Sequence, residues 1–215
     1  MSDLEKAAKL HENVPPDWYY QSIKNNLLQR YWHRRRFEEI QKVTEKVEGK
    51  ILDIGCADGI FTKVIFDKAK PSQLVAIDAL PSSVKWAKKH FKSNRKIKFQ
   101  VGDAHHLKFN KNTFDAVYAL EVLEHVLRPK DVLLQIKKVL KKGGYAVFLV
   151  PSDSDLFNIV WWIWTKFRGK IWNDCHIQSY RNGYLTRLSK QTGFKIDVDK
   201  KFILGMLHLI KVRKV

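Results

Sequence analysis

The stretch Ile51–Thr62, ILDIGCADGIFT, joins a short apolar run to the start of a helical pattern through a turn that contains two glycines. Glycine lets the backbone turn tightly and come close to a ligand. The helix that follows offers free N–H groups in its first turn. The same sequence could also form a strand–helix turn that binds no ligand. The residues farther along the chain distinguish a ligand-binding turn from a purely structural one.

From Lys50 onward, apolar runs typical of buried strands alternate with helical patterns. The expected strands are Ile51–Gly55, Leu74–Asp78, Ile97–Val101, Phe114–Leu120, Tyr145–Val150, Phe194–Ile203 and Met206–Val212. The expected helices are Ile60–Ala69, Ser82–Phe91, Pro129–Lys141 and about Arg181–Thr192, with Gly143 and Gly144 ending the third. This alternation predicts an α/β fold with a doubly wound, mostly parallel, seven-stranded sheet.

Two regions lie outside the regular alternation. We predict an N-terminal helical segment over residues 1–49, interrupted at Pro15–Pro16, and a main domain over residues 50–215. An insertion at about residues 151–180 holds four of the seven tryptophans and is expected to form a cap.

Acidic residues follow successive predicted strands. In an open α/β sheet, ligands bind beyond the carboxyl ends of the strands. Asp78 ends the second strand, where a carboxylate can accept hydrogen bonds from both hydroxyls of a ribose. Asp103 follows the third strand and could accept from an exocyclic amine, although such an aspartate is more often a turn or cap residue. A nicotinamide dinucleotide site would carry G-x-G-x-x-G, whereas this turn reads G-x-x-x-G.

The segment ALEVLEH, residues 119–125, follows the fourth strand. Two carboxylates and one histidine are not expected in a segment that is only buried core, so these side chains could belong to a site. Alternatively, one of the carboxylates could cap the next helix. Four signals therefore occur in order, each at the end of a predicted strand.

The motifs ILDIGCADG, VAIDA, GDAHHLKF, FDAVYALEVLEH and LKKGGYAVFLVP carry a family resemblance over about Lys50–Pro151. The chain resembles the class I methyltransferases that use S-adenosylmethionine (SAM), especially the group with small-molecule or lipid acceptors. The later HIQSYRNGYLTRLSKQTGF is similar to the segment after the fifth strand of that group. The resemblance implies a Rossmann-like fold, SAM as cofactor and methyl transfer as the reaction.

The resemblance also implies a role for each cofactor-site residue. The methionine part of SAM would be surrounded by Asp53, Gly55, Cys56 and Gly59. The ribose would be bound by Asp78, and the adenine would lie among Ala79, Leu80, Asp103 and Ala104. Leu120 and Glu121 would line the floor near the sulfonium. Ala57 departs from the family pattern, which often has glycine there.

Methyl transfer needs a general base only if the acceptor must lose a proton. The candidates are His125, His176 and Glu121, although a single histidine is more often structural. The two cysteines lie far apart without metal-ligand spacing, so we predict no metal site and a reducing, cytoplasmic location.

The flanking regions should select the acceptor, for which we expect a small, apolar or lipid-linked molecule. Residues 156–172, LFNIVWWIWTKFRGKIW, combine tryptophans with cations and suit peripheral contact with a membrane, or ordinary cap packing. The net charge of +18 favours RNA as an alternative acceptor, while ALEVLEH lacks the Asn/Asp-Pro-Pro-aromatic motif of many nucleic-acid methyltransferases. A non-catalytic SAM-binding or partner-binding domain is the third hypothesis.

The N-terminal segment allows two interpretations. Its tyrosines and arginines could close over the cofactor, with an arginine on the SAM carboxylate; these are Tyr19, Tyr20, Arg30, Tyr31 and Arg34. It could instead be a basic surface helix packed by Leu27, Leu28 and Trp32.

Overall fold

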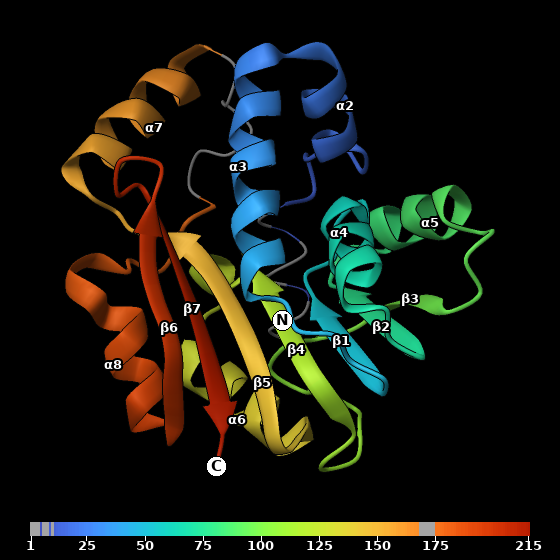
Figure 1. The fold of residues 1–215 in the computed structure, drawn as a ribbon. Helices are drawn as coiled ribbons and strands as arrows, with labels where there is room; N and C mark the ends of the chain where they lie inside the picture. The colour runs from blue at the N-terminus through green and yellow to red at the C-terminus, as the bar shows by residue number, and fades with distance from the viewer. Residues whose placement is uncertain (1–4, 6–8, 10, 168–174) are drawn as a thin grey trace.

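The computed structural model describes residues 5, 9, 11–167 and 175–215, which form one seven-stranded sheet with helices on both faces (Figure 1). The strands are β1 (Lys50–Ile54), β2 (Gln73–Asp78), β3 (Ile97–Val101), β4 (Phe114–Leu120), β5 (Leu140–Pro151), β6 (Phe194–Phe202) and β7 (Leu207–Lys214). Their order is β3-β2-β1-β4-β5-β7-β6. The strands β1 to β5 pair in parallel, and β7 lies antiparallel between β5 and β6. The predicted doubly wound, mostly parallel sheet is confirmed.

The helices cover the two faces of the sheet in separate groups. They are α2 (Trp18–Asn25), α3 (Leu27–Val43), α4 (Ile60–Ala69), α5 (Pro81–His90), α6 (Pro129–Val139), α7 (Asp155–Phe167) and α8 (Tyr184–Gln191), with short 3-10 turns η1 (Leu123–His125) and η3 (Arg181–Gly183). One apolar core packs α6 and α8 against the sheet, and the other packs α3, α4 and α5 against the opposite face. Both faces of the central strands are therefore buried, which explains their continuous apolar sequences.

The strand order changes direction at β1, whose neighbours are β2 on one side and β4 on the other. The loops that leave β1 and β4 therefore diverge and open a crevice at the carboxyl ends of the strands. In Figure 1, α2 and α7 lie at the end of the sheet to which the arrowheads of β5 and β6 point. These two helices are placed to form the walls of a site at that edge.

The third helix ends two residues before its predicted end at Lys141. Helix α6 stops at Val139, and Leu140 already has extended backbone and pairs with Phe114 of β4. Gly143 and Gly144 consequently lie inside β5 rather than after the helix. A Cβ on Gly144 would come 2.8 Å from the backbone oxygen of Asp115, so the irregular pairing between β4 and β5 needs a glycine there.

The N-terminal and tryptophan-rich regions depart from two expectations. Leu27 and Leu28 do not pack α3, because their exposed fractions are 76% and 81%. The helix packs instead through Ile40, which is fully buried. Of the expected insertion, α7 is described, whereas Arg168, Lys170 and Trp172 lie outside the described residues. No helix among the described residues has the length and apolar character needed to span a bilayer.

Candidate active site

The loop after β1 is tied to the end of β2. The backbone N–H groups of Gly55 and Cys56 both donate to the carbonyl of Ile77, over 2.8 and 3.0 Å. Gly55 has φ of 74°, and a Cβ there would lie 2.2 Å from Cγ2 of Val122. Ala57 also has positive φ, 44°, which costs an L-residue about 1–2 kcal/mol. Ala57 thus holds a backbone conformation that glycine adopts without this cost.

Asp78 joins this loop to the helix that follows β2. One carboxylate oxygen accepts from the N–H of Ala57 over 2.8 Å, and the other accepts from the N–H of Leu80 over 2.9 Å. Burial raises the pKa of Asp78, and these two hydrogen bonds oppose the shift. Each carboxylate oxygen has a second lone pair, so the group can still accept hydrogen bonds from a pair of vicinal hydroxyls.

A first cavity opens where these strand ends meet. Residues from the predicted cofactor site that line it are Gly55, Asp78, Ala79, Leu80, Asp103, Ala104 and Glu121. The structure therefore gathers loops from four strands around one space, as the strand-end argument predicts.

Four predicted cofactor residues do not line the first cavity. They are Asp53, Cys56, Gly59 and Leu120. Asp53 is buried and accepts a hydrogen bond from the hydroxyl of Thr62 over 2.6 Å; burial raises the pKa of Asp53 to about 7. Gly59 begins α4 with φ of 81°. In place of lining the cavity, Asp53 and Gly59 hold the loop against α4.

Asp103 and Asp58 each organise a further part of the wall. Asp103 accepts from the backbone N–H of His105 over 2.8 Å, as expected of an aspartate at a strand end. Asp58 is buried and accepts from the N–H of Tyr20 over 2.8 Å, and burial raises the pKa of Asp58 to about 6. The hydrogen bond from Tyr20 to Asp58 attaches α2 to the glycine turn and places the N-terminal segment over the first cavity.

A second cavity, of about 260 Å³, adjoins the first and is strongly aromatic. Both cavities are lined by Trp18, Tyr19, Glu121 and His125. The second adds Trp32, Arg36, Glu124, Phe157, Trp161, Trp164 and His176. Two compartments that meet at Glu121 and His125 suit a reaction between a cofactor and a separate, apolar ligand.

The N-terminal residues expected over the site divide into two groups. Tyr19 lines both cavities. Arg30 instead donates to backbone carbonyls of α2, and Arg34 is exposed and pairs with Glu38. The arginine that does reach the site is Arg36, which sequence reasoning missed.

Arg36 is 2% exposed and forms an ion pair with Glu121. It also donates to Nδ1 of His33 over 2.8 Å. Burial and the nearby guanidinium lower the pKa of His33 to about 2, so this imidazole is neutral and can accept. Because its carboxylate is held by Arg36, Glu121 is fixed between the cavities.

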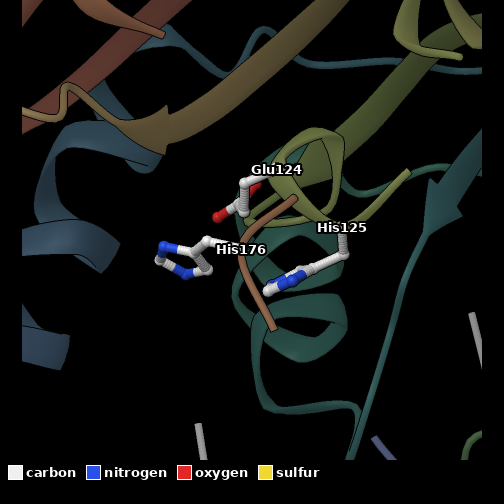
Figure 2. A group of neighbouring side chains, drawn as sticks. All are labelled: Glu124, His125 and His176. Atoms are coloured by element: carbon white, nitrogen blue, oxygen red, sulfur yellow. The ribbon is translucent and has the colours of Figure 1, made fainter. Parts of the chain in front are cut away.

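The other two catalytic candidates lie together at the edge of the second cavity. Figure 2 shows His125 and His176 around one space with Glu124, which was quoted in ALEVLEH but given no role. Burial lowers the pKa of His125, and it lowers the pKa of His176 to about 4. Burial raises the pKa of Glu124. We predicted no metal site, yet these three residues present ligand atoms within 4.8 Å of one another.

Comparison with known proteins places this architecture among methyltransferases. A methyltransferase domain family matches residues 52–148. The mitochondrial ubiquinone biosynthesis O-methyltransferase of Schizosaccharomyces pombe is 34% identical over 115 residues, covering 52% of this chain and 41% of that protein. The demethylmenaquinone methyltransferase of Thermotoga maritima is 25% identical over 188 residues, which is 80% of each protein.

Solved structures share the fold. An N-methyltransferase of Bradyrhizobium japonicum, crystallised with S-adenosyl-L-homocysteine, superposes with a TM-score of 0.68, 18% identity and coverage of 99% of both chains. The aligned part of the chain covers only about half of the length of the ubiquinone-type relatives.

Proposed function

Because the chain belongs to the class I SAM-dependent methyltransferases, we propose that it transfers the methyl group of SAM to a small aromatic acceptor of the quinone-precursor type. The observation that carries this proposal is the aromatic second cavity, which adjoins the cofactor cavity at Glu121 and His125. Four of its lining residues are tryptophans with rings suited to a flat apolar ligand; these are Trp18, Trp32, Trp161 and Trp164. The names of the ubiquinone- and menaquinone-type relatives support the same acceptor class.

The first cavity is proposed as the SAM site. Asp78 accepts the ribose hydroxyls, Ala79 and Leu80 flank the adenine, and Asp103 accepts from the adenine amine. SAM supplies the reactive methyl group, and the protein binds and aligns the two reactants. Correct alignment alone contributes a large part of such a rate enhancement.

Glu121 is proposed to position the two reactants rather than to remove a proton, since Arg36 already holds its carboxylate. His125 and His176 border the acceptor cavity, and the reacting hydroxyl of the acceptor is proposed to lie on their side of it. These assignments keep the acceptor next to the floor of the cofactor cavity.

The proposal is tested by methyl transfer from labelled SAM to three separate substrates: a catechol-type quinone precursor, the same ring with a polyprenyl tail, and RNA. Transfer to either ring, with the product located by mass spectrometry, supports the assignment. Transfer to RNA alone would establish the alternative that the charge of +18 favours. Tight SAM binding in calorimetry without transfer to any of the three would favour a non-catalytic SAM-binding domain.

We also propose that α7 contacts a lipid surface at the mouth of the acceptor cavity. Its outward side chains include Trp162 and Phe167, with exposed fractions of 62% and 79%, and the ammonium of Lys166 lies 5.6 Å from the Trp162 ring. Trp161 instead lines the cavity. Exposed aromatic rings beside a cation suit the headgroup region of an anionic membrane, where a polyprenyl acceptor would reside. The location is then cytoplasmic and peripheral.

A further inference from the structure

We infer that Glu124, His125 and His176 form a binding site for one divalent cation of the Zn²⁺, Co²⁺ or Mn²⁺ type. One carboxylate oxygen and two imidazole nitrogens lie within 4.8 Å of one another at the edge of the acceptor cavity. Figure 2 shows Glu124 and His125 coming from the same short turn and His176 from the segment that runs beside it. Cation binding at these residues requires neither SAM nor an acceptor, so the inference goes beyond the proposed function.

The first argument is an unsatisfied oxygen. Glu124 is 2% exposed, and among the described residues its Oε2 atom has no hydrogen-bond partner. The buried guanidinium of Arg36 forms its ion pair with Glu121 instead. A buried carboxylate oxygen without a hydrogen-bond partner destabilises the folded protein. A cation beside Glu124 would remove this cost.

The second argument is the orientation of the two imidazoles. Nδ1 of His125 donates to the backbone carbonyl of Cys175 over 2.8 Å. In the neutral ring this hydrogen bond leaves the lone pair on Nε2, which is the usual arrangement for a metal-binding histidine. The ring of His176 stacks on that of Trp161, with centroids 4.5 Å apart and planes 22° apart. Both rings are therefore fixed in orientation by contacts outside the cluster.

The third argument is the backbone that holds the cluster together. The carbonyl of Glu124 accepts hydrogen bonds from the N–H groups of Ile177 and Gln178, over 2.9 and 3.1 Å. Together with the bond from His125 to Cys175, they fix residues 175–178 against η1 although the two segments are about fifty positions apart. The ligand set is thus assembled before any cation arrives, which lowers the entropic cost of binding.

The donor set indicates which cations fit. Two imidazoles with one carboxylate suit borderline first-row cations such as Zn²⁺, whereas Mg²⁺ and Ca²⁺ prefer sites made of oxygen ligands. Three protein ligands also leave coordination positions open. In this setting His125 and His176 are cation ligands rather than proton acceptors, and Arg36 keeps Glu121 apart from the cluster.

The test uses the full chain after treatment with a chelator, with Zn²⁺ measured by calorimetry and Co²⁺ by its visible absorption. We expect about one cation per chain, together with a rise in melting temperature and much weaker binding of Mg²⁺. Glu124→Gln and His176→Ala should each weaken Zn²⁺ binding by tenfold or more. His90→Ala is the matched control, because His90 is exposed on α5 and lines neither cavity.

Circular dichroism in the presence of chelator shows whether each variant is folded, so that lost binding is not confused with unfolding. Absence of stoichiometric Zn²⁺ or Co²⁺ binding by the wild type would overturn the inference. Equal affinity in wild type, Glu124→Gln and His176→Ala would also overturn it, because the cation would then sit elsewhere. A cation bound without methyl transfer to any acceptor would uphold this site while rejecting the proposed function.

Discussion

Arg36, from the middle of α3, pairs with Glu121, which follows β4 and lies 85 positions later in the chain. The guanidinium lies over the rings of Tyr19, Trp32 and Phe61, at 5.3 to 5.9 Å from their centroids. The Arg36 guanidinium, which contacts three aromatic rings and one carboxylate, thereby holds α3 against Glu121 between the two cavities.

Replacing Arg36 with methionine should destabilise the fold by about 3–5 kcal/mol, because the half-buried carboxylate of Glu121 would lose the guanidinium that pairs with it. The double variant Arg36→Met, Glu121→Gln should recover much of this loss. Urea unfolding measures both. Arg34→Met is the control, since Arg34 is exposed and a solvent-exposed pair such as that with Glu38 contributes little to stability. Equal losses for Arg34→Met and Arg36→Met would contradict this account of the pair.

Asp78→Ala should weaken SAM binding by about 10- to 100-fold, the usual loss when hydrogen bonds to a charged group are removed. Calorimetry with SAM measures the effect. Asp67→Ala removes a carboxylate from an exposed pair with Lys63 on α4 and should leave SAM affinity unchanged. Unaltered affinity in Asp78→Ala would rule out the assigned ribose contact.

Asp53 should make the stability of the cofactor-free protein depend on pH. Its folded pKa is raised from 3.8 to about 7, so the folded state holds a proton that the unfolded state has released between these values. The free energy of unfolding therefore falls as pH rises from about 4 to about 7, by on the order of 2–4 kcal/mol from this group.

Asp53→Asn keeps a neutral side chain at every pH and should remove this part of the decline. The measurement is urea unfolding of both proteins at pH 4.5, 6 and 7.5. If the free energies of unfolding of wild type and variant changed with pH in the same way across this range, the assignment of Asp53 as a buried, protonated carboxyl would be wrong.

Substitutions at Trp162 and Trp161 should have different effects, the first on membrane binding and the second on acceptor binding. Trp162→Ala with Phe167→Ala should reduce flotation with anionic liposomes by about tenfold, because both rings are exposed. Trp161→Ala should leave flotation unchanged and raise the KM of the acceptor, since Trp161 lines the cavity and stacks on His176. Flotation that is absent in wild type, or unaffected by the double substitution, would refute the membrane contact.

The strand ends were predictable because a parallel sheet brings all of its carboxyl ends to one edge, so Asp78 and Asp103 could be placed from their positions after apolar runs. Whether a residue faces the cavity or supports the loop was not predictable. Asp53 and Gly55 are two positions apart in the same motif, yet only Gly55 lines the cavity. That difference depends on Thr62, whose hydroxyl holds the Asp53 carboxylate.

The residues that sequence reasoning missed depend on contacts between distant segments. Arg36 is one of three consecutive arginines, and nothing in the sequence separates the buried one from the exposed Arg34. Glu124 was visible in ALEVLEH, but its relationship to His176 arises only through backbone hydrogen bonds between the two segments. No pattern of spacing along the chain encodes such a pair.

The chain leaves the sheet after β5 and returns to nearly the same point, because the carboxylate of Asp153 accepts the N–H of Tyr180 over 2.6 Å. Lengthening a loop whose ends are already joined costs little, about 0.6 kcal/mol for each doubling of its length. A segment of different length or sequence could therefore replace residues 154–179 at little cost in loop-closure entropy. Such a replacement would change the part of the second cavity that Phe157, Trp161, Trp164 and His176 line, while the wall from α2 and α3 and the seven-stranded sheet stayed the same.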